Sequence, residues 1–317
     1  MKASNMNILA LSGGVGGAKL ALGLAQVLAG EQLTIIANTA DDFEHLGLAI
    51  SPDLDTVMYT LAGLNNQDLG WGLAGESWHC MQALERLGGE TWFRLGDKDL
   101  ATHLYRSQRL LEGASLSEIT QALTQRLAIK PTLLPMCDEP VRTQVKTAAG
   151  PLDFQRYFVG EQCRPEVSGF HFTGIEQTTL STQIAQAIDG ADALVVCPSN
   201  PFVSVAPILA VNGLKARLLA KPIARVVVSP IVGGMALKGP AAKMMRELAM
   251  PVTALAVAEY YRDFATHFVL DSSDSGYAAP IRELGMQVLV TNTVMKTLQD
   301  KQALAEAILT FSQQTAE

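Results

Sequence analysis

The chain has 317 residues, of which 48% are hydrophobic and 17% charged, and its formal net charge is −7. The negative charge argues against a nucleic-acid-binding surface and favours small-molecule ligands. No uninterrupted apolar run approaches membrane-spanning length, so we expect no membrane partner. The four cysteines lack metal-binding or redox spacing and the first residues lack a signal-peptide pattern, so we expect a cytoplasmic enzyme.

Short apolar runs alternate with longer helical patterns along most of the chain. Strands are expected at residues 7–11, 33–37, 193–197, 225–229, 253–257, 267–270 and 287–290. Helices are expected at residues 17–28, 55–63, 77–87, 179–188, 241–248 and 298–311. Alternation of apolar strands with helices predicts an α/β fold, with a Rossmann-like, doubly wound and mostly parallel sheet covered by helices on both faces.

Residues 97–174 interrupt this alternation. They begin with two helical patterns, the second of which carries a capping-box signal at Ser115 and Glu118. Residues 131–174 are β-rich and include a strand-like aromatic run at 154–158. We therefore predict a helical and β-rich subdomain, residues 97–174, inserted over the carboxyl edge of the sheet. The rest of the chain, residues 1–96 and 175–317, forms the Rossmann-like core.

The most informative segment follows the first predicted strand. Residues 12–19 read Ser-Gly-Gly-Val-Gly-Gly-Ala-Lys and lead into a helix, which brings backbone N–H groups and a helix N-terminus up to an anion. The substrate-binding candidates here are Gly13, Gly14, Gly16, Gly17 and Lys19. Neither the dinucleotide fingerprint nor the P-loop fingerprint is intact, which disfavours a nicotinamide dehydrogenase. We expect an anion site of a less common type; the alternative is a tight turn that binds no ligand.

Carboxylates gather after the second strand and at the start of the next helix. Asn38, Asp41 and Asp42 follow the strand, and Asp53 and Asp55 begin the helix. The carboxyl ends of parallel strands share one edge with the glycine segment, and oxygen ligands there suit Mg²⁺. For the second pair of acids the alternative is helix capping, and for the first pair it is a solvated loop.

Two later segments offer polar groups at the same edge. Residues 198–201 read Pro-Ser-Asn-Pro and form a rigid turn after a buried strand. Residues 233–243 form a glycine loop with two lysines before a helix, and a loop without a ligand fits that sequence equally well. The substrate-binding candidates in these segments are Ser199, Asn200, Gly234 and Lys238.

Taken together, these segments resemble the 2-phospho-L-lactate transferase family (CofD-like), which acts in the biosynthesis of the deazaflavin coenzyme F-420. The matching segments follow one another in order and are residues 13–19, 38–42, 51–61, 96–99, 198–201 and 229–234. The departure that we note is Val15, where the family commonly has threonine. It removes one hydroxyl group near the expected anion site but leaves the backbone donors in place.

The resemblance implies a Rossmann-like fold, a homodimer and Mg²⁺-dependent transfer between two small-molecule substrates. In this family the donor is a guanosine diphosphate-linked three-carbon phosphoacid, and lactyl, enolpyruvyl and glyceryl variants all fit the sequence. The terminal hydroxyl group of the deazaflavin precursor attacks the phosphorus atom that bears the acid, and GMP leaves.

Attack of an alcohol on a diphosphate needs positioning, charge neutralisation and proton removal. We expect Asp42 and Asp55 to bind the metal and Asp41, with Asp42 as the other candidate, to accept the proton. A nucleotide-sugar-binding regulator of related fold is the alternative, which would carry the glycine segment and the acidic turn without turnover. That group has a Gly-Gly-Ser-Ser type run where this chain has Phe-Glu-His at residues 43–45.

Overall fold

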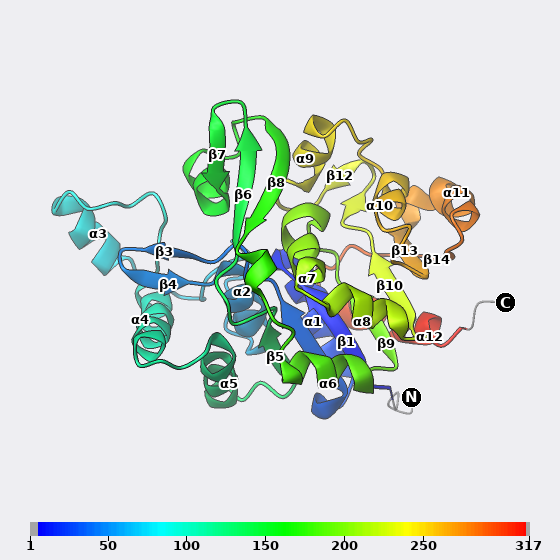
Figure 1. Cartoon of the computed structure of the whole chain (residues 1–317), viewed down its shortest axis with the longest axis horizontal. Coiled ribbons are helices and arrows are strands. Elements are labelled where there is room, and N and C mark those ends of the chain that lie inside the picture. Colours follow the sequence, from blue (N-terminus) through cyan, green and yellow to red (C-terminus); the bar gives the residue numbers. More distant parts are fainter. Residues whose placement is uncertain (1–5, 315–317) are drawn as a thin grey trace.

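A computed structural model describes residues 6–314 of the chain. Its centre is a seven-stranded sheet with the order β14-β13-β10-β9-β1-β2-β5, drawn in Figure 1. The strands are β1 (Ile8–Ser12), β2 (Leu33–Ala37), β5 (Thr132–Pro135), β9 (Ala193–Val196), β10 (Ala224–Val228), β13 (His267–Asp271) and β14 (Gln287–Thr291). All pairings in this sheet are parallel, which confirms the predicted α/β class.

Strand order reverses between β1 and β9. From β1 the chain proceeds outward through β2 to β5, then returns to β9 and proceeds the other way to β14. In an open α/β sheet a ligand-binding crevice forms outside the carboxyl ends of the strands at such a reversal. The glycine segment follows β1 and the Pro-Ser-Asn-Pro turn follows β9, so the fold brings both to this crevice.

The sheet is buried on both faces because successive side chains of a strand point in opposite directions. In β1, Leu9 and Leu11 pack into one apolar cluster, whereas Ile8 and Ala10 pack into another on the opposite face. This arrangement explains why the strands are continuously apolar in the sequence rather than alternating.

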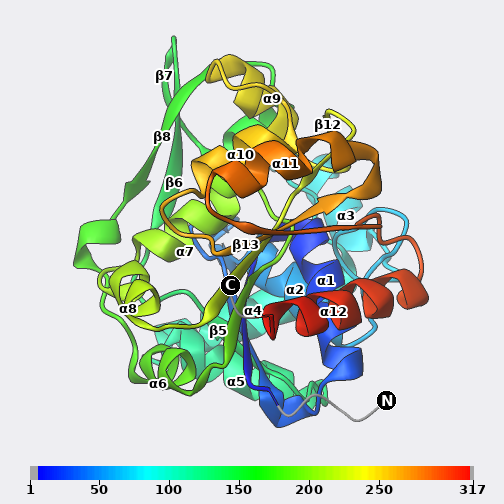
Figure 2. The same cartoon turned by 90° about the vertical axis from the view of Figure 1, so that its right-hand side faces the viewer.

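Helices cover both faces, as Figure 2 shows with α1 and α12 on one side and α6, α7 and α8 on the other. The helices that follow the first half of the sheet are α1 (Gly14–Val27), α2 (Pro52–Leu61), α3 (His79–Arg86), α4 (Asp97–Leu111) and α5 (Leu116–Arg126). Those of the second half are α6 (Thr182–Gly190), α7 (Ala206–Ala210), α8 (Leu214–Ala220), α9 (Ala241–Glu247), α10 (Ala254–Tyr260), α11 (Ala278–Glu283) and α12 (Leu298–Ser312). The predicted capping box at Ser115 and Glu118 is present at the start of α5.

Three smaller sheets stand outside the main one. They are β3 (Phe43–His45) with β4 (Leu48–Ile50), β6 (Arg142–Thr147) with β7 (Gly150–Asp153) and β8 (Val167–Thr173), and β11 (Ile231–Val232) with β12 (Met235–Ala236). The sheet of β6, β7 and β8 projects at the top of Figure 1. It supplies the β-rich character that the sequence indicates for residues 131–174.

Strand β5 requires a correction to the predicted insertion of residues 97–174. It pairs with β2 and so belongs to the main sheet, where it forms an edge. Pro131 precedes this strand and Pro135 is its last residue, and an edge strand tolerates proline because one side of its backbone has no partner strand. The division of the chain into a core and an inserted subdomain otherwise stays a prediction.

Two predicted strands are wrong. Residues 253–257 lie at the start of α10, where the Thr253 side chain accepts a hydrogen bond from the Ala256 N–H as a helix cap. The run at 154–158 leads into a helical turn, Arg156–Gly160, around the buried Tyr157. Both are short runs of about five residues, too short for their periodicity alone to assign them to strand or helix.

Among the described residues, no single helix is both long and apolar enough to cross a membrane. One bent pair, Pro201–Ala210 with Leu214–Ala220, meets the criteria by length and composition only.

Candidate active site

A cavity of about 650 Å³ lies at the carboxyl edge of the sheet, where the strand order reverses. Nine of the predicted site residues line it, namely Gly13, Gly14, Gly16, Lys19, Asp41, Asp55, Ser199, Asn200 and Lys238. Four do not line it, namely Gly17, Asn38, Asp42 and Gly234. The structure therefore brings most of the predicted site together and places the others behind its wall or beside its mouth.

The glycine segment is the N-terminus of α1. Gly13 is the extended residue before the helix, and its N–H donates to Ser199 Oγ at 3.1 Å across the strand reversal. A Cβ atom at Gly16 would overlap the carbonyl oxygen of Pro198, and one at Gly17 would lie 2.5 Å from Ser199 Oγ. Gly16 and Gly17 are therefore needed for the close packing of α1 against the turn after β9.

One end of the cavity is basic. Lys19, Lys238 and Lys296 line it, and the latter two are exposed. Burial lowers the pKa of Lys19, and the charges of Lys238 and Lys301 lower it further. Since like charges gather here beside a helix N-terminus, this end favours an anion.

The cavity also holds two groups of carboxylates, one of which lies against the start of α1, where the Gly14 backbone forms a hydrogen bond to Asp53. The first, which we call the uncompensated cluster, consists of Asp41, Asp42 and Asp53. All three side chains are buried, and no ion pair reaches them within residues 6–314. One carboxylate oxygen of Asp41 and one of Asp42 have no hydrogen-bond partner.

The pKa values of this cluster follow from burial without a cation. Burial raises the pKa of Asp41 well above its ordinary value, and the neighbouring carboxyl group of Asp53 raises it further. Burial also raises the pKa of Asp42, to about 8, although the hydroxyl of Ser51 and the charge of Arg106 lower it. The Ser51 hydroxyl donates to Asp42 at 2.6 Å.

Asn38 supports this cluster from behind the cavity wall. Its amide group donates to Asp53 Oδ2 at 3.0 Å and to the carbonyl oxygen of Val203 at 3.2 Å, while its oxygen accepts from the Ala40 N–H. Asn38, at the end of β2, therefore holds Asp53 of α2 in place. The sequence predicted instead that Asn38 faces a substrate.

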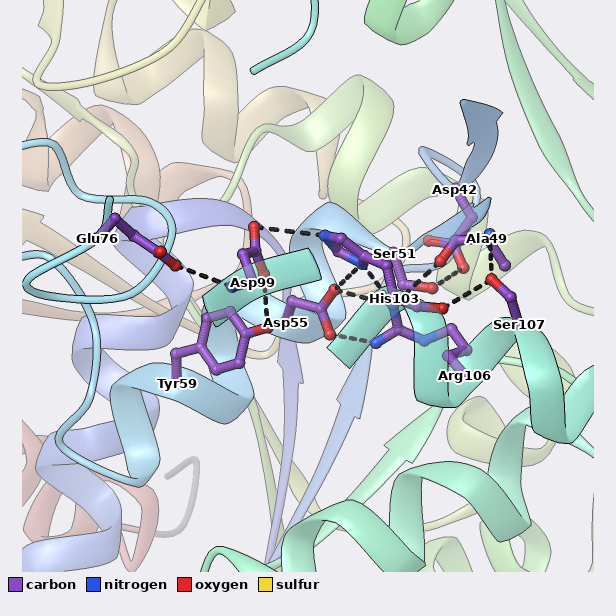
Figure 3. Close-up of polar contacts among 10 residues, drawn as sticks. All are labelled: Asp42, Ala49, Ser51, Asp55, Tyr59, Glu76, Asp99, His103, Arg106 and Ser107. Atoms are coloured by element: carbon purple, nitrogen blue, oxygen red, sulfur yellow. Dashed lines mark hydrogen bonds and ion pairs between the residues drawn. The ribbon is translucent and has the colours of Figure 1, made fainter. Parts of the chain in front are cut away.

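The second group, which we call the paired cluster, consists of Asp55, Asp99, His103 and Arg106 and appears in Figure 3. Arg106 is 1% exposed, and its guanidinium group forms a two-pronged ion pair with Asp55. His103 Nδ1 lies 3.3 Å from Arg106 NH1, and its Nε2 lies 3.3 Å from Asp99. Because the guanidinium group only donates, Nδ1 is the acceptor and Nε2 carries the proton toward Asp99.

Each acid of the paired cluster is thus compensated. Burial would raise the pKa of Asp99, but the hydrogen bond from His103 outweighs it, together with the hydroxyl of Tyr59, which donates at 2.6 Å. Burial would lower the pKa of Arg106, but the charge and hydrogen bonds of Asp55 raise it overall. Asp55, Asp99 and His103 also offer ligand atoms within 4.8 Å of one another.

Aromatic side chains form part of the cavity wall. Trp92, Phe93, Phe154 and Phe158 line it, and the Trp92 and Phe93 rings meet edge to face with centroids 5.7 Å apart. The indole of Trp71 also lines the cavity and is 43% exposed. Such a wall suits a flat ring, which gains both apolar contact and favourable ring geometry there.

The sequence of this chain matches the family described as 2-phospho-L-lactate transferase CofD over residues 8–309. The chain belongs to that family. Among similar proteins, the 2-phospho-L-lactate transferase of Methanosarcina mazei is 35% identical over 302 residues, 95% of this chain and 99% of that protein. The phosphoenolpyruvate transferase of Kitasatospora aureofaciens is 37% identical over 316 residues, 98% of each chain.

Membership of the CofD family confirms the resemblance drawn from the sequence and does not favour the regulator alternative. The solved structures add the fold. A protein of the upf0052 family from Bacillus halodurans matches with a TM-score of 0.65 and 14% identity, covering 98% of this chain and 99% of that one. At this identity the likeness concerns the fold alone.

Two residues of this CofD-family site were not foreseen from the sequence, His103 and Arg106. Helix α4 presents them with Asp99 at spacings of four and three residues, which places all three side chains on one helix face. That spacing is visible in the sequence. Nothing in the sequence, however, tells that this face meets Asp55 of α2.

The predicted metal ligands Asp42 and Asp55 fall into different clusters. Asp42 lies behind the cavity wall against Ser51, and Asp55 is neutralised by Arg106. The carboxylates that line the cavity without a cationic partner are Asp41 and Asp53. The assignment of metal ligands and base therefore stays a prediction, and the geometry points it toward the uncompensated cluster.

Proposed function

We propose that the chain transfers a phospho-three-carbon-acid group from a guanosine diphosphate-linked donor to the terminal hydroxyl group of the deazaflavin precursor of coenzyme F-420, releasing GMP. Relatives of this chain bear the names 2-phospho-L-lactate transferase and phosphoenolpyruvate transferase. The observation that carries the proposal is that one cavity is lined both by buried carboxylates without an ion-pair partner and by lysines.

The basic end is suited to the anionic parts of the donor. The ammonium groups of Lys19 and Lys238, beside the N-terminus of α1, attract phosphate or carboxylate oxygens. Val15, where the family commonly has threonine, lines this end too and leaves recognition there to the backbone and the lysines. The aromatic wall then offers a flat surface for the ring of the acceptor.

The uncompensated cluster fits a hard divalent cation such as Mg²⁺, which we propose as the cofactor. The carboxylate oxygens without partners and the raised pKa values of Asp41 and Asp42 show that negative charge there is unfavourable without a cation. Asp41 and Asp53 would hold the ion, with Asp42 close behind. When bound, Mg²⁺ neutralises charge on the oxygens of a diphosphate.

The chain's own residues then position the acceptor and take its proton. The oxygen of the terminal hydroxyl group forms a bond to the phosphorus atom that bears the acid, the bond from phosphorus to the GMP oxygen breaks, and the hydroxyl proton passes to a carboxylate. Asp41 is suited to accept it, since its side chain lines the cavity and one of its oxygens has no hydrogen-bond partner.

Incubation of the purified protein with the deazaflavin precursor and each guanylylated three-carbon donor in turn tests this function. We expect release of GMP, detected by chromatography, together with a phosphodiester product whose mass identifies the donor used. Addition of a chelator should stop the reaction and Mg²⁺ should restore it. Binding of nucleotide with no GMP release from any donor would contradict the proposal and support a regulator.

We also propose that the protein acts in the cytoplasm as a homodimer. The dimer is what the resemblance noted in the sequence implies, and a reducing compartment suits four free cysteines. Measurement of mass in solution by light scattering tests the dimer directly.

A further inference from the structure

Residues 64–74, which we call the lid loop, form a compact loop with its ends joined. The Ala74 N–H donates to the Leu64 carbonyl at 2.8 Å and closes the base. Asn66 organises the interior, because its backbone pairs with Gly70 and Gly72 and its side chain accepts from two further N–H groups. A loop that satisfies its own backbone in this way keeps its shape when it moves as a unit.

The tip of the lid loop covers the basic end of the cavity. Leu69, Trp71 and Gly72 line the cavity, and Leu69 is 46% exposed on its outer side. Gly70 is buried between two residues of other segments: a Cβ atom there would lie 3.2 Å from Val15 Cγ1 and 2.8 Å from Lys238 Nζ. The tip therefore rests on the glycine segment through the apolar side chain of Val15.

Lys238 forms a hydrogen bond to the tip of the lid loop. Its ammonium group donates to the Leu69 carbonyl oxygen at 3.2 Å, although the lysine lies far away in the sequence and is itself exposed. Its loop is anchored in turn, since the Gly233 N–H donates to the buried Asp274 at 2.9 Å. The lid loop is thus joined to a fixed part of the cavity wall by one side chain that also faces the basic end.

We propose that Lys238 is a positioning residue that couples closure of the lid loop to occupation of the basic end by an anion. An ammonium group has three donors, so Lys238 can hold the Leu69 carbonyl and an anion at the same time. An anion shared with Lys19 restrains the lysine side chain and with it the lid loop. This inference rests on the anion site of the proposed function. It adds an order of events, in which binding of the donor closes the lid loop over the cavity.

A thiol at the tip reports on closure. In a Cys80→Ser/Cys163→Ser background, Leu69→Cys keeps the backbone carbonyl and presents a sulfur atom at the partly exposed position, whose rate of maleimide labelling is measured. Lys238→Met in this background should label about three- to tenfold faster without any ligand, because a charge-assisted hydrogen bond is lost. Lys215→Met, an exposed lysine of α8, is the matched control and should leave the rate unchanged.

Inorganic pyrophosphate serves as the anion, and its binding is measured separately by calorimetry. At saturation it should slow labelling of the Leu69→Cys thiol about three- to tenfold when Lys238 is present and leave it unchanged in the Lys238→Met protein. Equal labelling rates of the two proteins without ligand would contradict the proposal that Lys238 holds the lid loop. Binding of pyrophosphate without a change in labelling would overturn the coupling.

These results are separable from the proposed function. If the protein behaves as expected toward pyrophosphate but releases no GMP from any donor, the role of Lys238 in closing the lid loop is supported and the transferase proposal is contradicted. Absence of pyrophosphate binding would overturn the anion-coupled closure, while GMP release measured independently would still decide the transferase. Lys238→Arg should regain part of the slowing of labelling by pyrophosphate that is lost in Lys238→Met. If Lys238 only supported the loop structure, labelling would not respond to pyrophosphate in either protein.

Discussion

The two acidic clusters of the cavity contain the same kind of side chain at similar depth but differ in their surroundings. In the paired cluster, Asp55 and Asp99 are met by Arg106 and His103. In the uncompensated cluster, no ion pair reaches Asp41, Asp42 or Asp53 in the described part of the chain. Among the described residues, each acid of the first cluster therefore has a basic side chain within ion-pair distance, and no acid of the second cluster does.

This difference separates structural from functional use of buried charge. A buried charge is tolerated when a partner of opposite charge is present, and its removal then harms the fold. A buried carboxylate without a partner instead raises its pKa, which is common at functional sites. We therefore expect substitutions in the paired cluster to affect mainly stability and substitutions in the uncompensated cluster to affect mainly activity.

The largest effect is expected from Arg106→Met. It leaves the Asp55 carboxylate buried and unpaired, so the free energy of unfolding should fall by about 3–5 kcal/mol in urea titrations. Arg109→Met on the same helix breaks only an exposed pair with Glu112 and should cost less than about 1 kcal/mol.

The double variant Asp55→Asn/Arg106→Met sharpens this prediction. It removes both charges and should be more stable than Arg106→Met alone, because no uncompensated charge remains. If Arg106→Met proves no more harmful than Arg109→Met, the paired cluster does not stabilise the fold and the comparison fails.

The sequence predicts the sheet well because its strands are fully apolar and end in polar segments at one edge. It also places the glycine segment correctly, since strand, glycines and helix follow one another locally. It does not predict that Asp55 meets Arg106, because 51 residues separate them and a tertiary contact between α2 and α4 brings them together. Likewise, the sequence suggests Asn38 as a substrate-binding residue, yet its amide NH₂ group already donates hydrogen bonds to Asp53 and to the carbonyl oxygen of Val203.

Strand β5 and helix α10 show the same limit in the fold. Thr132–Pro135 becomes a strand of the main sheet through its pairing with β2, a contact over about a hundred residues that a local pattern does not contain. Residues 253–257 are apolar enough for a strand, but capping by Thr253 decides in favour of a helix. Tertiary contacts and caps, rather than propensity, settle such short segments.

The second effect, on activity, is expected from Asp41→Asn. The amide has the same shape but neither accepts the proton nor attracts a cation, so kcat should fall by about 10²-fold or more. Stability should not fall, because burial already favours the neutral form at this position. Asp55→Asn is the matched control from the paired cluster, and urea titration should show a loss of stability because Arg106 is left unpaired.

A loss of stability in Asp41→Asn with full GMP release would reverse the roles assigned to the two clusters. Steady-state kinetics and urea titration on both asparagine variants distinguish these outcomes. Equal behaviour of the two variants would mean that the surroundings of the carboxylates do not determine their use.

A third, smaller effect concerns pH. The pKa of Asp42 is about 8 in the folded protein against an ordinary 3.8, so the folded state holds a proton that the unfolded chain releases. The stabilisation from this group is fully present below the ordinary pKa and is lost as the pH rises through about 8. Without a divalent cation, the free energy of unfolding should therefore fall by about 2 kcal/mol from pH 6 to pH 8.

Addition of Mg²⁺ should recover more of this stability at pH 8 than at pH 6, because the ion competes with protons for the same carboxylates. Urea titrations at both pH values, with chelator or with Mg²⁺, measure the four quantities needed. If the free energy of unfolding in chelator rises with pH instead, the carboxyl groups of the uncompensated cluster are ionised in the folded protein at no cost in stability.

The smallest effect is expected from Ser51→Ala, which changes the surroundings of the uncompensated cluster without changing its charges. The Ser51 hydroxyl donates to Asp42 at 2.6 Å and lowers the pKa of that carboxyl group, so its removal should raise the pKa above about 8. The free energy of unfolding should fall by about 1 kcal/mol at pH 6, where Asp42 is protonated, and by more at pH 9, where the lost bond is to a carboxylate. Urea titrations at the two pH values give this difference directly. A loss that is equal at both values would mean that Asp42 keeps one protonation state throughout, and the contrast with Asp55, which is paired with Arg106, would no longer rest on the proton of Asp42.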